Sequence, residues 1–141
     1  MEEREIQIRR AEVRDAAEVA RLLHDFNTEY EAETPPLPEL VRHAERMLRE
    51  GEMVVLLAAE PALGLALLRF RPSVWTEKSE AYLQELYVVP GRRGEGHGEA
   101  LMKAAIGVCR EEGAAWIELN TSESDVAARR TQPPQAMSAM D

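Results

Sequence analysis

The spacing of apolar residues changes several times along the chain, and each change predicts a different element of secondary structure. Ile6 and Ile8 alternate with polar residues, as in a short strand. Apolar residues then recur every three or four positions in residues 16–30 and 38–50, which predicts two amphipathic helices. Their inward positions are Val19, Leu22, Leu23, Phe26 and Tyr30 in the first helix and Leu40, Ala44, Met47 and Leu48 in the second.

Both helices carry residues suited to their ends. Asp15 is placed to cap the first helix, and Glu18, three residues later, completes a capping box. Pro38 is suited to the first turn of the second helix, and Gly51 to its C-terminal end. A polar and acidic connection, residues 29–36, separates the two.

Strands dominate the middle of the chain. Residues 53–59 are almost all apolar and predict a buried strand, and residues 63–70 predict its hairpin partner after a turn at Glu60 and Pro61. A longer loop, residues 71–79, holds Trp75, and a fourth strand is expected at residues 81–89.

A third helix follows, because apolar residues again recur at helical spacing, and Gly113 is placed to end it. Residues 116–120 predict a fifth strand. The order β-α-α-β-β-β-α-β predicts an α/β fold with a mixed sheet, antiparallel early and parallel where the third helix joins the last two strands. The helical positions are Leu101, Ala105 and Val108 on one face and Met102, Ile106 and Cys109 on its neighbour.

The turn between the fourth strand and the third helix is rich in glycine. Gly94, Gly96 and Gly98 alternate directly before the helix, so the backbone can curl and present its N–H groups to an anion such as phosphate. A P-loop would need a Lys followed by Ser or Thr after the last glycine, and a Rossmann fingerprint would need a glycine at Glu99. A phosphate site of another kind therefore fits best, and a glycine-rich connection without a ligand is the alternative.

The amino-acid composition limits the kinds of molecule that the protein is expected to bind. The 141 residues fit one domain, and a net charge of −9 argues against nucleic acid and favours a cationic partner. Neither a membrane span nor a signal peptide is recognisable, so we expect a cytoplasmic protein. Cys109 is the one cysteine, expected as core filler, and His24, His43 and His97 lack metal-ligand spacing, so no metal is expected.

Arg93 begins the sequence Arg-Gly-Glu-Gly-His-Gly, of the form R-x-x-G-x-G, and a strand ending in Val-Val-Pro precedes it. This combination resembles the acetyl-CoA motif of the GNAT superfamily of N-acetyltransferases. The resemblance implies a mixed central sheet with helices on both faces and acetyl-CoA as cosubstrate. It also implies acetyl transfer to a primary amine, either a small cationic amine or an exposed protein amine. A nucleotide-phosphate binder unrelated to CoA is the weaker alternative.

The resemblance assigns the acetyl-CoA site to the end of the fourth strand and the glycine turn. Backbone N–H groups around Tyr87 and Val88 would polarise the thioester carbonyl, and the strand end would bond the pantetheine arm. Arg92 is expected at the adenosine phosphate or in solvent, and Asn120 at the pantetheine amides. The residues implied in binding are Tyr87, Val88, Val89, Arg92, Arg93, Gly94, Gly96, His97, Gly98 and Asn120.

Acetyl transfer to an ammonium group needs a base that first removes a proton. Glu85 is the leading candidate. By strand alternation it would share a face with Ala81, Leu83 and Tyr87, where apolar neighbours would raise its pKa. Glu80, acting through a water, is the second candidate. The alternative for Glu85 is a place at the solvated margin of the strand.

The resemblance places the acceptor pocket between the first two helices and the loop before the fourth strand. Glu29, Tyr30, Glu31 and Glu33 would lie on one side and Trp75 on the other, a combination suited to a cationic amine. The alternative is a solvated acidic loop.

The resemblance ends near residue 130, so we expect a domain of residues 1–130 and an atypical tail of residues 131–141. Gln132 stands where many family members have a tyrosine that protonates the CoA thiolate, and the last strands of the family fold are not evident. Three explanations remain open. Water serves as the acid, the tail docks on a second copy in a homodimer, or the chain is a catalytically impaired acyl-CoA-binding or interaction protein.

Overall fold

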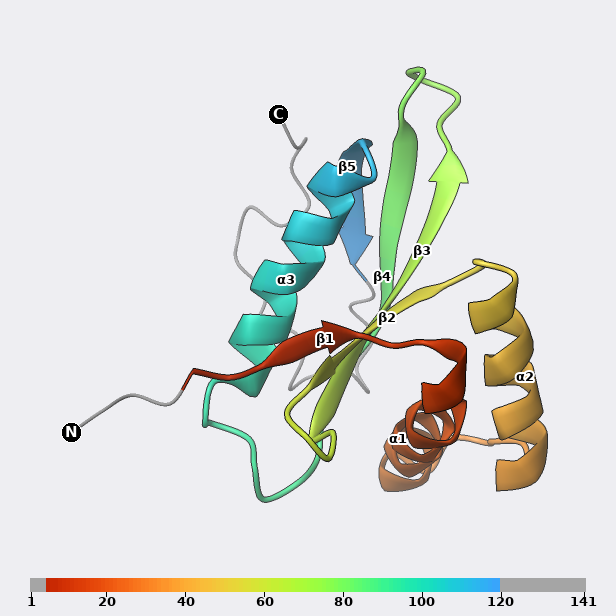
Figure 1. Cartoon of the computed structure of the whole chain (residues 1–141), viewed down its shortest axis with the longest axis vertical. Coiled ribbons are helices and arrows are strands. Elements are labelled where there is room, and N and C mark those ends of the chain that lie inside the picture. The colour runs from red at the N-terminus through yellow and green to blue at the C-terminus, as the bar shows by residue number, and fades with distance from the viewer. Residues whose placement is uncertain (1–4, 120–141) are drawn as a thin grey trace.

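The computed structural model describes residues 5–119 (Figure 1). In these residues five strands form one sheet, and they lie in it in the same order as in the sequence. The elements are β1 (Ile8–Arg10), η1 (Val13–Asp15), α1 (Ala16–Glu29), α2 (Leu37–Arg49), β2 (Val54–Ala58), β3 (Gly64–Pro72), β4 (Ser79–Val88), α3 (His97–Glu111) and β5 (Ala114–Leu119).

The strand pairing confirms the predicted mixed sheet. Strands β1 to β4 pair antiparallel with their neighbours, whereas β4 and β5 are parallel and are connected by α3. A parallel pair needs such a crossover, because the chain must return to the starting end of the sheet. The expected β2–β3 hairpin is present. The last residue of the expected fifth strand, residue 120, and the expected tail of residues 131–141 lie outside the described residues.

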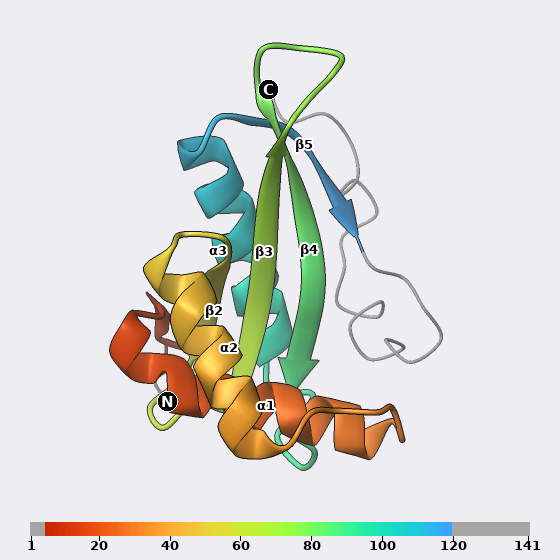
Figure 2. The ribbon, with the colours of Figure 1, turned by 90° about the vertical axis from the view of Figure 1, so that its right-hand side faces the viewer.

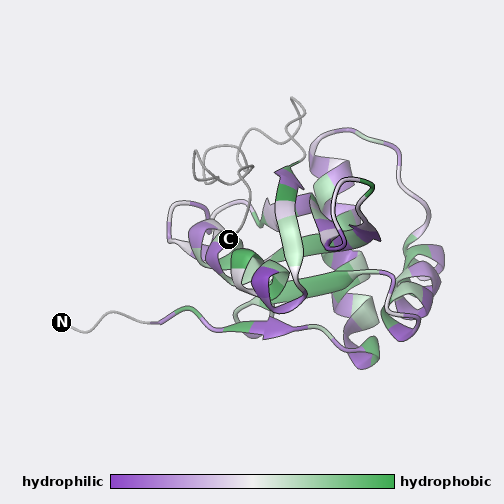
Figure 3. Ribbon diagram, turned by 90° about the horizontal axis from the view of Figure 1, so that it is seen from above, coloured by the Kyte–Doolittle hydropathy of each residue, from purple (hydrophilic) through white to green (hydrophobic). Residues whose placement is uncertain are grey.

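Helices cover both faces of the sheet, as Figure 1 shows, with α1 and α2 on one side and α3 on the other. Leu68 and Leu83 of the sheet are buried against α3, together with Leu101 of that helix. On the other face, Leu65 is buried together with Leu22 of α1. Seen from above in Figure 3, the hydrophobic colour concentrates on the central strands between these helices. Burial of these side chains from water is the main force that holds the layers together.

The start of α1 differs from the predicted capping box. The box forms one turn earlier, around η1, where the backbone N–H of Glu12 donates to Asp15 Oδ2 at 2.7 Å. Glu18 instead accepts a hydrogen bond from the backbone N–H of Ala62 at 2.6 Å and so ties α1 to the β2–β3 turn. The prediction was wrong because Glu18 has a partner 44 residues away.

A β-bulge in β4 is the main departure from the sequence prediction. Leu67 pairs with Glu85 while the next residue, Leu68, pairs with Leu83, so Gln84 is an extra residue in β4. Because one extra residue reverses the alternation, Leu83 faces α3, and from Glu85 onward the odd-numbered residues face the side of α1. The predicted common face of Glu85 with Ala81 and Leu83 was therefore wrong, whereas its common face with Tyr87 fits the register.

Candidate active site

The glycine turn adopts the curled backbone that its sequence predicts. Gly94 and Gly96 have φ angles of +87° and +99°, in the left-handed region that favours glycine. The turn begins with a hydrogen bond from the N–H of Arg92 to the carbonyl of Val89 at 3.2 Å. A Cβ added at Gly94 would meet no atom within 4 Å, so this part of the backbone borders open space.

The N-terminus of α3 opens directly onto this turn. Gly96 is the N-cap residue, and no side chain of the described residues caps it. The N–H groups of the first helical turn have no carbonyl of the preceding turn to bond, and the helix dipole adds positive potential there. The turn and the helix end together can bind a phosphate group through backbone N–H groups.

In the described residues, strands β4 and β5 pair only between Ser79 and Leu83, and from there to Val88 β4 pairs with β3. The N–H of Val89 donates to the carbonyl of Leu63 at 2.9 Å, which fixes the direction of the peptide groups in this part of β4. By alternation, Leu86 and Val88 direct their N–H and carbonyl groups away from β3 and toward the side of β5.

This direction changes part of the sequence prediction. The N–H of Tyr87 points toward β3, as its pairing with Leu65 requires, and the N–H of Val89 is also taken by the β3 side. Neither amide is available beside β5. Val88 keeps the orientation that the prediction needs, and Leu86, which the prediction overlooked, shares it.

The two candidate bases differ in their surroundings. Glu85 is half-buried on the α1 side of β4, one pleat from Tyr87. Glu80 is buried, and its Oε1 accepts a hydrogen bond from Arg71 Nε at 2.8 Å. Arg71 also contacts Glu118 on β5 at 3.1 Å, so Glu80 belongs to an ion-pair network at the start of the strand. The hydrogen bond that Arg71 Nε donates to Glu80 raises the pKa of Arg71.

Glu29, Tyr87 and Arg93 meet in one cluster where α1 ends beside β4. The Arg93 guanidinium donates to both oxygens of Glu29 at 2.9 Å, and the Tyr87 hydroxyl donates to Glu29 Oε1 at 3.1 Å. Burial, followed by this hydrogen bond to the carboxylate, raises the pKa of Tyr87 to about 12. The Arg93 side chain therefore faces α1, and a phosphate in the turn would meet the backbone rather than this guanidinium.

The remaining charged residues of the turn are also paired or covered. Arg92 Nε donates to Glu95 at 3.0 Å, so its nearest anionic partner is within the turn. His97 is buried, and its Nδ1 lies 3.8 Å from Glu95 Oε1. The carboxylate of Glu95 thus lies within contact distance of both Arg92 and His97.

The predicted acceptor residues do not all come together. Tyr30 packs on Phe26 at the end of α1, with 5.2 Å between ring centroids, and Glu31 and Glu33 are exposed beyond it. Trp75 is 80% exposed in the β3–β4 loop, at the opposite end of the sheet from α1 (Figure 2). Eight strand residues, or about 26 Å, separate Tyr87 from Ser79, where that loop ends.

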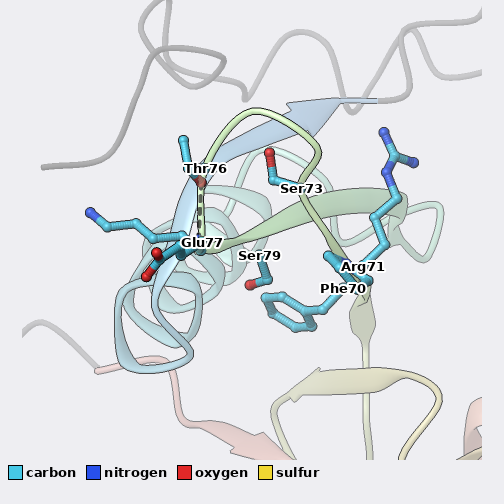
Figure 4. Close-up of a pocket in the computed structure, with 8 residues that line it drawn as sticks. Phe70, Arg71, Ser73, Thr76, Glu77 and Ser79 are labelled. Atoms are coloured by element: carbon cyan, nitrogen blue, oxygen red, sulfur yellow. Dashed lines mark hydrogen bonds between the residues drawn. The ribbon is translucent and has the colours of Figure 1, made fainter.

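The β3–β4 loop has a pocket of its own. It has a volume of about 620 Å³ and is lined by residues 70–73 and 76–79 (Figure 4). This pocket is remote from the glycine turn. Asn120 lies outside the described residues. Within residues 5–119, no group of three or more His, Cys, Asp or Glu side chains could hold a metal ion, and no helix is long and apolar enough to cross a membrane.

Comparisons with known proteins agree with this geometry. The sequence model of the Acetyltransferase (GNAT) family matches residues 18–131. A protein from Arthrobacter sp. FB24, provisionally described as an acetyltransferase, is 45% identical, with a TM-score of 0.80 over 95% of this chain and 91% of that one. A comparison with curated proteins found no match.

Two more distant structures share the fold. A ribosomal-protein-alanine N-acetyltransferase from Brucella melitensis is 22% identical, with a TM-score of 0.78 over 98% of this chain and 94% of that one. An aminoglycoside acetyltransferase from an uncultured soil metagenomic sample, in complex with sisomicin, is 21% identical, with a TM-score of 0.75 over 91% and 88%. The chain therefore belongs to the GNAT family of acetyl-CoA-dependent acetyltransferases.

Proposed function

We propose that this protein transfers the acetyl group of acetyl-CoA to a primary amine that carries positive charge. The observation that supports the proposal most directly is the uncapped N-terminus of α3, which opens onto the left-handed turn at Gly94 and Gly96. This end of α3 follows the end of β4, where Leu86 and Val88 direct their N–H groups away from β3.

In this proposal the backbone does most of the cosubstrate binding. The N–H groups of Arg93, Gly94, Gly96, His97 and Gly98 hold the pyrophosphate, which backbone donors at a helix N-terminus favour. The pantetheine arm lies along the outward peptide group of Leu86 and the N–H of Val88, whose carbonyl already accepts a hydrogen bond from Arg93 Nε. The N–H of Leu86 or Val88 then stabilises the negative charge that develops on the thioester oxygen during attack.

Glu85 is the proposed general base. It lies half-buried on the α1 side of β4 after the bulge, one pleat from Tyr87. Glu80 is a weaker candidate, because it lies at the start of β4, whereas the glycine turn follows the end of that strand. Once the base has taken a proton from the ammonium group, the free amine attacks the thioester carbonyl and forms a C–N bond. The C–S bond then breaks, and the CoA thiolate takes up the second proton that the new amide nitrogen loses.

The proposed acceptor is cationic because the chain has a net charge of −9 and because Glu31 and Glu33 are exposed beside the end of α1. Two of the structural relatives are named for an aminoglycoside and for the alanine of a ribosomal protein. A small polyamine-like molecule and a protein N-terminus are therefore the two acceptor classes to test first.

The test combines acetyl-CoA binding by calorimetry with thiol release in the presence of a panel of amines. Gly96→Val forces a β-branched residue into a φ of +99° and brings it to Ile6, so we expect at least a tenfold loss of acetyl-CoA affinity. Gly107→Ala is the control, because a Cβ there meets nothing within 4 Å in the middle of α3. Unchanged affinity in Gly96→Val would refute the phosphate site.

The same assay examines the base. We expect Glu85→Gln to lower kcat by about 10²-fold or more, since an amide cannot accept the proton, while acetyl-CoA affinity stays as in the wild type. An undiminished kcat would exclude Glu85. Wild-type binding without thiol release from any amine would favour the non-catalytic acyl-CoA-binding alternative.

A further inference from the structure

We propose that Glu29 is a positioning residue of the acetyl-CoA site, which holds the glycine turn in place through Arg93, and not a ligand of the acceptor amine. The inference rests on the proposed binding of acetyl-CoA at that turn. It replaces the acceptor role that the sequence suggested for Glu29.

The Arg93 side chain connects three parts of the molecule. Its two terminal nitrogens donate to Glu29 at the end of α1, each at 2.9 Å. Its Nε donates to the carbonyl of Val88 at the end of β4, at 2.8 Å. Its own backbone begins the glycine turn. A planar guanidinium can make these three bonds at once, which a lysine ammonium cannot do with the same geometry.

The carboxylate of Glu29 has little capacity left for another cation. Both of its oxygens accept from Arg93, and Oε1 also accepts from the Tyr87 hydroxyl at 3.1 Å. The Glu29 and Arg93 side chains are only 26% and 31% exposed. An incoming amine would have to break the bidentate ion pair of Glu29 with Arg93 before it could bind, so Glu29 is poorly suited to hold the acceptor.

Aromatic rings support the same arrangement. Arg93 Cζ lies 5.6 Å from the centroid of the Tyr87 ring, and Phe26 lies 5.2 Å from that ring, centroid to centroid. Phe26 and Tyr87 are both buried. The hydrogen bonds of Glu29 and Arg93 are thus made against a packed surface, which limits the other positions that these side chains can adopt.

The function of this cluster follows from the flexibility of the turn. Gly94 and Gly96 give the segment before α3 many accessible conformations, and acetyl-CoA must select one of them. Arg93, bonded to both Val88 and Glu29, anchors the residue directly before Gly94. A preorganised turn loses less conformational entropy when its N–H groups bind the pyrophosphate.

An alternative role for Glu29 predicts the opposite change in acetyl-CoA affinity, so an experiment can distinguish the two roles. If Glu29 only withheld Arg93 from the phosphate, its removal would release a cation beside the site and tighten binding. If Glu29 holds the turn, its removal weakens binding in spite of the gain in positive charge. The sign of the change decides between them.

The experiment compares Glu29→Gln with the wild-type full-length chain, by calorimetry with acetyl-CoA and by steady-state kinetics. We expect Kd and KM for acetyl-CoA to rise about tenfold, while kcat changes by less than about twofold. Asp25→Asn is the matched control. It removes the same charge one turn earlier on α1, where Asp25 pairs only loosely with Arg21 at 3.8 Å. Its affinity should equal that of the wild type.

Arg93→Gln tests whether Glu29 acts through Arg93. Acetyl-CoA affinity should fall in this variant, and adding Glu29→Gln to it should cause no further loss. Circular dichroism of each variant verifies that the chain is folded. Unchanged or tighter binding in Glu29→Gln, an equal loss in Asp25→Asn, or additive losses in the double variant would each overturn the inference. Failure of the wild type to bind acetyl-CoA would instead refute the proposed function, and the inference with it.

Discussion

At the scale of single residues, Tyr87 makes the most direct electrostatic prediction. Its pKa is raised to about 12, first by burial and then by the hydrogen bond to Glu29. The folded protein therefore holds the phenol proton more tightly than the unfolded chain, where the pKa is about 10. The stability that this group contributes is fully present below about pH 10 and is lost as the pH rises from there through the folded pKa.

We expect the free energy of unfolding of the wild type to fall more steeply above about pH 10 than that of Tyr87→Phe. Urea denaturation at a series of alkaline pH values measures both slopes. The difference between the phenolate absorbance of the wild type and that of Tyr87→Phe should show a midpoint near pH 12. A midpoint near the ordinary value of about 10 would mean that Tyr87 is not held as described.

The residue types of the glycine turn made its backbone conformation predictable, but they did not make the pairing of its side chains predictable. Gly94 and Gly96 have the positive φ angles that an alternating glycine turn requires, and this could be expected from sequence alone. The pairing of Glu29 with Arg93 could not be, because these residues are 64 positions apart and an acidic loop offers several equivalent partners. Only the packing of α1 beside the end of β4 selects Glu29.

At the scale of elements, the bulge at Gln84 determines which side chains reach the site. Deleting Gln84 would make Glu85 follow Leu83 directly, so the pairing of β4 with β3 would become regular and residues 85–88 would keep their faces. Deleting Leu83 instead would put the polar Gln84 in its place in the core under α3. We expect the Gln84 deletion to cost less than about 2 kcal/mol of stability and the Leu83 deletion to cost about 2–5 kcal/mol, as large core substitutions do.

Urea denaturation followed by circular dichroism measures both costs. Deletion of Thr76, in the exposed β3–β4 loop, is the control, and it should leave the chain folded with a free energy of unfolding close to that of the wild type. A Gln84 deletion that costs as much stability as the Leu83 deletion would contradict the assigned register.

Periodicity predicted the existence and order of the elements well, but not their local irregularities. The helical spacing of Val19, Leu22 and Phe26 is reproduced by their burial on α1. The capping box moved to η1 because Glu18 bonds Ala62, and the bulge reversed the face of Glu85. Both differences arise from contacts with other strands, which a pattern within one segment does not contain.

At the scale of the whole molecule, the net charge of −9 should draw a cationic acceptor toward the protein. Salt screens this attraction, since the Debye length is about 10 Å at an ionic strength of about 0.1 M. We expect KM for a cationic amine to rise about threefold between about 20 mM and about 200 mM salt, with kcat unchanged. A neutral amine is the control. Equal salt dependence for both would argue against electrostatic recognition of the acceptor.

The arrangement of layers could be predicted from the element order, because a crossover helix and two earlier helices must cover different faces of the sheet. The relative position of the loops could not. Trp75 and Glu29 were expected on two sides of one pocket, yet the length of the β3–β4 hairpin places them at opposite ends of the sheet. Strand length and register set that separation.

The exposure of Trp75 also has a practical consequence for spectroscopy. The chain has two tryptophans, and the other, Trp116, lies half-buried on β5. Because Trp75 is 80% exposed, replacing it with phenylalanine should disturb little and leave Trp116, on the strand beside β4, as the single tryptophan. The emission of Trp116 in such a variant would report on the region between β4 and β5 without any attached label.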